Sequence, residues 1–250
     1  MAFHPDVTVL NHAFIRIFQD RANDFLIDPR EPVLDHFVAA AHEMALGGER
    51  GAVGGHILHS HAFGDETLRN AYLDRFGWGA KPQSTCLLWK DATRVTNYVA
   101  EQGIDLAQVG AALPALRFVM MVRNPVDICI SSIRKGYSAR LVGEARKDDF
   151  DAVFNHMISV FAAFSGLAAA RPDQFRYLYQ DEMVDRDALI ALCRFLDISV
   201  DEGWLDDIGR LIHLRASYPL PPGSKARLKA RVHELIVDEA VARRVAAQIV

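Results

Sequence analysis

Two hydrophobic runs of this chain are each followed by a cationic residue. A cationic side chain at the end of a buried strand can bind an anion. The run from Phe118 to Val122 is followed by Arg123, and Ser131 comes eight positions after that arginine. A planar guanidinium and a hydroxyl can surround one phosphate group with charge-assisted hydrogen bonds. The run TCLLW at 85–89 likewise ends at Lys90. Because ligands bind beyond the carboxyl ends of the strands in open parallel sheets, Arg123 and Lys90 are candidate site residues.

The elements that would position these residues follow from hydrophobic periodicity. It predicts helices over 33–44, 65–77, 93–103, 126–141, 151–170 and 186–198, and a final helix from Lys225. Short apolar runs predict strands at 85–89 and 118–122, and FRYLYQD predicts another at 175–181. The segment 7–18 fits either a strand or one helical face. Strands that alternate with helices indicate an α/β fold with a mostly parallel sheet.

Size and composition are those of one globular domain covering residues 1–250. Of the 250 residues, 50% are hydrophobic and 24% are charged, and a chain of this length buries roughly 70 to 75% of its unfolded surface. A net charge of -4 argues against a general nucleic-acid binder, which needs a surplus of Lys and Arg.

The cysteines and the hydrophobic segments bear on the compartment. Three widely spaced cysteines in apolar runs, Cys86, Cys129 and Cys193, predict a reducing compartment and hence a cytoplasmic protein. The first residues do not read as a secretory leader, and no uninterrupted apolar window of about 18 residues occurs, so we expect no membrane span.

The segment RFVMMVRNPVDICISS at 117–132 resembles the 3′-phosphate-binding segment of sulfotransferases. The family pattern is a strand, Arg, Asp or Asn, Pro, an Asp two residues on, and a Ser eight residues after the Arg. Three further stretches are similar to family segments: HPDV at 4–7, LLWKDATRV at 87–95 and FRYLYQDEMVDRDALIALCRFLDI at 175–198. The chain departs from the family at Gln180, where Glu is usual, and at Asp197, where Gly is usual.

This resemblance implies a three-layer fold with a mostly parallel central sheet flanked by helices. It implies 3′-phosphoadenosine-5′-phosphosulfate as the sulfonate donor and requires no metal. Arg123 and Ser131 would bind the 3′-phosphate, with Arg215 or Lys225 supplying a basic group from the proline-rich loop between them. The acceptor would be a small molecule, a glycan or a peptide, and the sequence does not identify it.

The resemblance also suggests residues for the transfer step. Lys90 would contact the leaving 5′-phosphate or merely cap its strand. In relatives that modify tyrosines or sugar chains, the base is a Glu several residues after the His-Pro, and counting from HPDV leads to Asn11 and His12. Because an imidazole titrates near neutral pH, His12 is the candidate base, although a histidine without a catalytic role is the alternative.

One expected part of the family pattern is missing from the sequence. Relatives hold the phosphosulfate in a Gly-Thr-containing loop after their first strand, and these 250 residues contain no such loop. The resemblance therefore predicts a domain without that strand and loop. The alternative function is an inactive or truncated nucleotide binder that retains only the 3′-phosphate half-site.

A histidine cluster offers a different chemistry. His56, His59 and His61 in HILHSH have a spacing at which imidazoles can bind zinc, which would suit a metal-dependent hydrolase. No Asp, Glu or Cys at firm ligand spacing completes such a site, so a loop or acceptor-pocket role is the preferred interpretation. The Gly-rich stretch at 47–55 lacks Gly-Lys-Ser/Thr and is not a phosphate loop.

Overall fold

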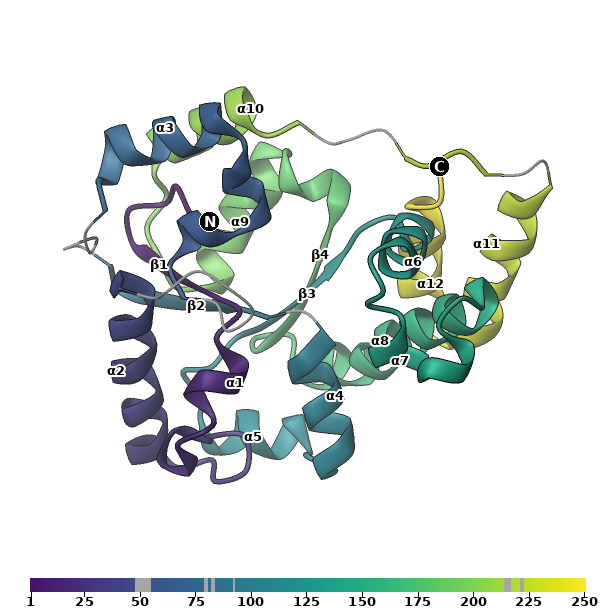
Figure 1. Ribbon diagram of the computed structural model, residues 1–250, viewed down its shortest axis with the longest axis horizontal. Helices are drawn as coiled ribbons and strands as arrows, with labels where there is room; N and C mark the ends of the chain where they lie inside the picture. Colours follow the sequence, from purple (N-terminus) through teal and green to yellow (C-terminus); the bar gives the residue numbers. More distant parts are fainter. Residues whose placement is uncertain (48–54, 79–80, 82–83, 92, 214–216, 221–222) are drawn as a thin grey trace. The chain divides into compact units, whose positions relative to one another are not determined.

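The computed structural model describes residues 1–47, 55–78, 81, 84–91, 93–213, 217–220 and 223–250 (Figure 1). The chain divides into two compact units. Unit 1 contains residues Met1–Ala115 and Ile190–Ile212, and unit 2 contains residues Leu116–Leu189 and His213–Val250. Each unit has its own pair of parallel strands, and α9 (Arg186–Phe195) contributes residues to both units.

The sheet of unit 1 joins strands that lie far apart in the sequence. β1 (Val7–Asn11) pairs in parallel with β2 (Cys86–Lys90), and the register sets Asn11 opposite Lys90. The ambiguous segment 7–18 therefore begins as a strand and continues into the short helix α1 (Phe14–Ile17). The carboxyl ends of the two strands lie side by side.

The helices of unit 1 begin and end at residues that satisfy their backbone groups. α2 (Glu31–Gly47) confirms the helix predicted at 33–44. α3 (Glu66–Phe76) begins after Asp65, whose carboxylate accepts hydrogen bonds from two backbone N–H groups, and ends at Gly77, which takes φ 64°. The other helices with residues in unit 1 are α4 (Thr93–Gln102), α5 (Leu106–Ala112), α9 (Arg186–Phe195, from Ile190 on) and α10 (Glu202–Leu211).

Aromatic side chains fill the space between α2 and the sheet of unit 1. Phe37 of α2 packs 4.7 Å from Phe25 and 5.1 Å from Trp89 of β2, measured between ring centroids. Rings of this kind bury large apolar areas and stabilise a core beyond the area term when they meet edge to face. This packing fixes β2, and with it Lys90 at the strand end.

The sheet of unit 2 is also a parallel pair. β3 (Phe118–Val122) pairs with β4 (Phe175–Tyr179), and the rings of Phe118 and Phe175, which are opposite in the register, stack 4.7 Å apart. β3 has the predicted bounds, and β4 confirms the strand predicted over 175–181 but ends at Tyr179, where a 3₁₀ turn (Gln180–Met183) begins. Between them the chain passes through α6 (Pro125–Arg134), α7 (Ala139–Val142) and α8 (Phe150–Ala170).

The helix after β3 is shorter than predicted, since the pattern over 126–141 indicated one helix. Gly136 takes φ 68°, and the N–H of Tyr137 donates to the carbonyl of Ser132 at 2.8 Å. A left-handed glycine with this bond is a standard helix terminus. The single predicted helix is therefore wrong, and the chain forms α6 and α7 instead.

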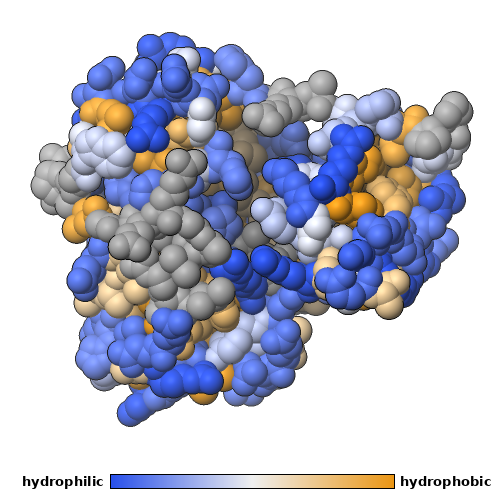
Figure 2. All heavy atoms as spheres, viewed as in Figure 1, coloured by the Kyte–Doolittle hydropathy of each residue, from blue (hydrophilic) through white to orange (hydrophobic). Residues whose placement is uncertain are grey.

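α8 supplies much of the core of unit 2. Val153, Phe154, Ile158 and Phe161 are buried, together with residues of α11 (Ser224–Leu235) and α12 (Glu239–Ala247). Within the described ranges, α8 is the one helix long and apolar enough to cross a membrane, and 33% of its most apolar window is buried. Core helices of soluble proteins have the same composition. Hydrophilic residues predominate on the face drawn in Figure 2, with smaller hydrophobic patches between them.

The strand pairing establishes a parallel α/β architecture. The described residues form two sheets of two strands each, β1 with β2 and β3 with β4. The sulfotransferase resemblance implies one central sheet. The pairing of the described strands establishes the α/β class but does not by itself establish that sheet.

Candidate functional site

Arg123 emerges at the carboxyl end of β3 in unit 2. The residue before it, Val122, is the last of the strand and is buried, whereas Arg123 itself is exposed. Among the described residues its guanidinium has no hydrogen-bond or ion-pair partner. An exposed arginine without a carboxylate partner retains all of its donors for an anion.

Asn124 fixes the turn between Arg123 and α6. Its side-chain oxygen accepts a hydrogen bond from the N–H of Val126 at 3.0 Å and caps the helix, while Pro125 occupies the first helical position. Its side-chain amide donates to Ser217 Oγ at 3.0 Å, and its backbone N–H donates to Gln180 Oε1 at 3.2 Å. Asn124 is 2% exposed, so these bonds form away from bulk water.

Residues 217–218 of unit 2 lie on one face of α6. The N–H of Tyr218 donates to Asp127 Oδ1 at 2.9 Å, and the Arg134 guanidinium lies 4.7 Å from the centre of the Tyr218 ring. Ser131 is four residues after Asp127 and three before Arg134, so it shares their face. Ser131 is half-buried, and within the described ranges its hydroxyl has no hydrogen-bond partner.

Two basic residues were predicted to supply positive charge from this loop, Lys225 and Arg215. Lys225 lies in the first turn of α11, is exposed, and makes no ion pair with another residue of the described chain. Arg215 lies outside the described residues. The resemblance related this loop to the 3′-phosphate site only through Arg215 or Lys225. The contacts of Asn124 with Ser217 and of Asp127 with Tyr218 were not predicted.

Unit 1 brings together the other two predicted site residues. Lys90 Nζ lies 3.0 Å from His12 Nε2 and 3.4 Å from Asn11 Oδ1. His12 Nδ1 lies 3.6 Å from Asp91 Oδ1, and the Asp91 side chain is 2% exposed. The imidazole is thus held between an ammonium group and a carboxylate at the ends of β1 and β2.

Backbone and solvation shape this cluster further. His12 has φ 61°, which is uncommon for a residue other than glycine, and its N–H donates to the Lys90 carbonyl at 2.8 Å. Lys90 is an exposed residue, but neighbouring protein atoms exclude water from its ammonium group. This desolvation lowers the pKa of Lys90, and the nearby Asp91 charge acts in the opposite direction. Sequence reasoning missed Asp91, although it follows a strand end.

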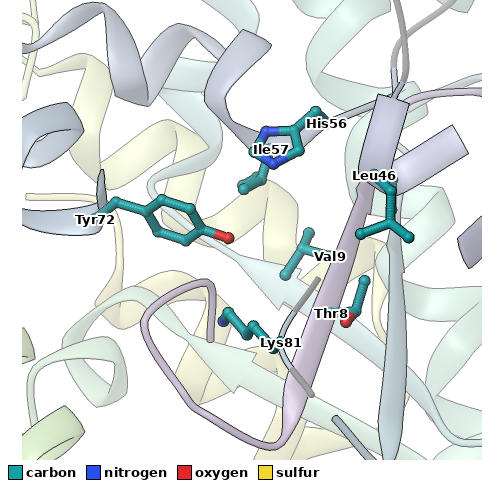
Figure 3. Close-up of a pocket in the computed structure, with 8 residues that line it drawn as sticks. Thr8, Val9, Leu46, His56, Ile57, Tyr72 and Lys81 are labelled. Carbon is teal, nitrogen blue, oxygen red and sulfur yellow. The ribbon is translucent and has the colours of Figure 1, made fainter. Parts of the chain in front are cut away.

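A small hollow lies beside β1 in unit 1 (Figure 3). Its volume of about 10 Å³ is that of one water molecule, so it does not hold a substrate. Burial lowers the pKa of His56 and raises that of Tyr72 to about 12, which keeps both side chains neutral. The lining residues are Thr8, Val9, Ala45, Leu46, His56, Ile57, Tyr72 and Lys81.

The histidine cluster does not form a metal site in the described part of the chain. His56 and His59 have ring centroids 6.2 Å apart, but His61 is exposed on a separate 3₁₀ turn. His56 Nδ1 accepts a hydrogen bond from the Leu58 N–H at 3.1 Å. Among the described residues, no group of three His, Cys, Asp or Glu side chains could hold a metal ion.

No protein-family model matches this chain, and neither a curated protein nor a solved structure matches it. Functional conclusions therefore depend on the residues of the chain and on the motif resemblance.

Proposed function

We propose that this protein transfers a sulfonate group from 3′-phosphoadenosine-5′-phosphosulfate to a hydroxyl or amine acceptor. The observation that carries the proposal is the arrangement around Arg123: a guanidinium that no other described residue binds, a turn fixed by Asn124, and residues 217–218 held on the face of α6 that bears Ser131. In this proposal Arg123 and Ser131 bind the 3′-phosphate of the donor. The proposal includes a three-layer fold with one mostly parallel central sheet.

The transfer step needs charge stabilisation and a proton acceptor. An oxygen of the acceptor forms a bond to sulfur while the bond from sulfur to the 5′-phosphate oxygen breaks, leaving adenosine 3′,5′-bisphosphate. The acceptor proton passes to His12 Nε2. Lys90, as an ammonium group, stabilises the negative charge that develops on the leaving phosphate.

Two further observations are compatible with this assignment. The cysteines Cys86, Cys129 and Cys193 are free thiols, and the proposal places the protein in the cytoplasm, a reducing compartment. Gln180, which stands where relatives carry Glu, accepts the hydrogen bond of the Asn124 N–H, so this departure leaves the turn intact.

Binding of adenosine 3′,5′-bisphosphate tests the 3′-phosphate assignment. Arg123→Ala should weaken binding by about 2 to 4 kcal/mol through loss of charge-assisted hydrogen bonds, which is roughly 30- to 700-fold in affinity. Arg146→Ala is the matched control, because Arg146 is an exposed arginine of the same unit that pairs with Asp149 at 2.9 Å.

Calorimetry measures these affinities, first with the bisphosphate and then with adenosine 5′-monophosphate, which lacks the 3′-phosphate. Arg123→Ala should leave that weaker affinity nearly unchanged. Equal losses for both nucleotides, or no loss for the bisphosphate, would refute the assignment. Tight binding without sulfonate transfer to any acceptor would support the inactive nucleotide binder instead.

A further inference from the structure

We propose that Asp91 is a positioning residue that fixes the tautomer of His12, so that Nδ1 carries the proton and Nε2 presents its lone pair. This inference rests on the proposed function in one respect, namely that His12 accepts the acceptor proton. Neither the sequence pattern nor the motif resemblance assigns a role to Asp91.

The strand register brings the two side chains together. Asn11 is opposite Lys90 in the parallel pair, so the next residues, His12 and Asp91, leave the sheet at the same place. The hydrogen bond of 2.8 Å from the His12 N–H to the Lys90 carbonyl extends the pairing by one step. The imidazole is therefore anchored through its own backbone beside the carboxylate.

The neighbours of the two ring nitrogens select the same tautomer. A lysine ammonium has only donors, so His12 Nε2, 3.0 Å from Lys90 Nζ, must face it with a lone pair. An ionised carboxylate only accepts, so Nδ1, 3.6 Å from Asp91 Oδ1, faces it with its N–H. The distance of 3.6 Å exceeds that of a hydrogen bond, and the attraction strengthens when the ring gains a positive charge.

Burial makes the Asp91 charge effective. Its side chain is 2% exposed, whereas that of His12 is 34% exposed. A charge in a poorly solvated position acts more strongly on its neighbours than one in water. Asp91 can thus orient the ring from the protein side while the ring remains open to an acceptor.

Lys90 must move for the reaction to proceed, because it occupies the lone pair of Nε2 in this structure. Anionic oxygens of the donor would draw its ammonium away and leave Nε2 free. The acceptor proton then passes to Nε2, and the resulting imidazolium lies beside the Asp91 carboxylate. No other co-reactant is needed for this balance.

Nitrogen-15 NMR of the histidine-labelled full chain tests the proposal without reference to activity. His12→Gln identifies the His12 signals among those of the ten histidines. The wild-type ring should show a protonated Nδ1, and Asp91→Asn should shift the ring toward the Nε2-protonated tautomer. Asp91→Glu should restore the wild-type pattern, and Asp74→Asn, at an exposed position of α3, should leave it unchanged.

Activity provides the second readout. Asp91→Asn should lower kcat about tenfold or more with little change in the KM of the donor, and Asp91→Glu should recover part of the loss. A wild-type ring protonated at Nε2 would overturn the proposal, even where Asp91→Asn does not fold. A wild type without any sulfonate transfer would refute the proposed function, whereas the tautomer would still decide the role of Asp91.

Discussion

Replacing Asn124 with Ala tests whether one side chain holds both the start of α6 and the loop beside it. The change removes the helix cap on Val126, which costs about 1 kcal/mol, and the donor to Ser217 Oγ, which costs about another 1 kcal/mol. The bond from the backbone N–H of residue 124 to Gln180 survives. We therefore expect a loss of about 2 kcal/mol that is concentrated at this turn.

Hydrogen exchange is the suitable assay, because a chain of two compact units need not unfold in one step. A local loss of about 2 kcal/mol corresponds to roughly 30-fold faster exchange. The amide of Val126, which loses its acceptor, and that of Tyr218, which bonds Asp127 in the adjoining segment, should show it. Amides of β1 in unit 1 serve as the internal reference.

Asn124→Asp is the matched control variant. Its carboxylate can still accept from the Val126 N–H, and it can accept a hydrogen bond from the Ser217 hydroxyl. Exchange at Val126 should therefore stay close to wild type in Asn124→Asp and accelerate in Asn124→Ala. Unchanged protection of Val126 in the alanine variant would refute this account of the turn.

Two further predictions concern unit 1. Asp197 has φ 54° after α9, so Asp197→Ala should be about 1 kcal/mol less stable in urea unfolding than Asp197→Gly; equal stability would contradict strain at this residue. Burial lowers the pKa of Lys81 from 10.5 to about 7, so the unfolded chain binds the extra proton above pH 7 and wild-type stability should rise from there toward pH 10. Denaturation measured at several pH values should show no such rise for Lys81→Met. If the stability of both proteins changes with pH by the same slope, the backbone carbonyls that accept hydrogen bonds from Lys81 offset the effect of its burial, and the prediction is wrong.

The sequence predicted a helix or strand well where one uninterrupted hydrophobic pattern covers the whole element. The apolar run from Phe118 to Val122 is β3 with the same bounds, and the apolar helix at 151–170 is α8, which begins one residue earlier. α5 was missed because its seven residues give too short a pattern. The break between α6 and α7 depends on the conformation of Gly136, which hydrophobic periodicity does not report.

The departure at Asp197 has a structural explanation that the sequence alone did not supply. The N–H of Ile198 donates to the Cys193 carbonyl at 3.0 Å, which closes the end of α9 and requires a left-handed residue at position 197. Glycine adopts that conformation without steric cost, and aspartate is among the few other residues that tolerate it. The position therefore reflects backbone geometry and carries no evidence about the site.

The two parts of the candidate site differ in how far sequence could predict them. Arg123, Asn124 and Ser131 belong to one strand, turn and helix, so the anion site proposed for them could be predicted from one short segment of the sequence. His12 and Lys90 are 78 positions apart, and their contact depends on the register of β1 with β2. A slip of one residue would turn every side chain of one strand to the opposite face and separate the imidazole from both Lys90 and Asp91. The chemistry proposed for His12 is therefore a property of the strand pairing, which no local pattern encodes.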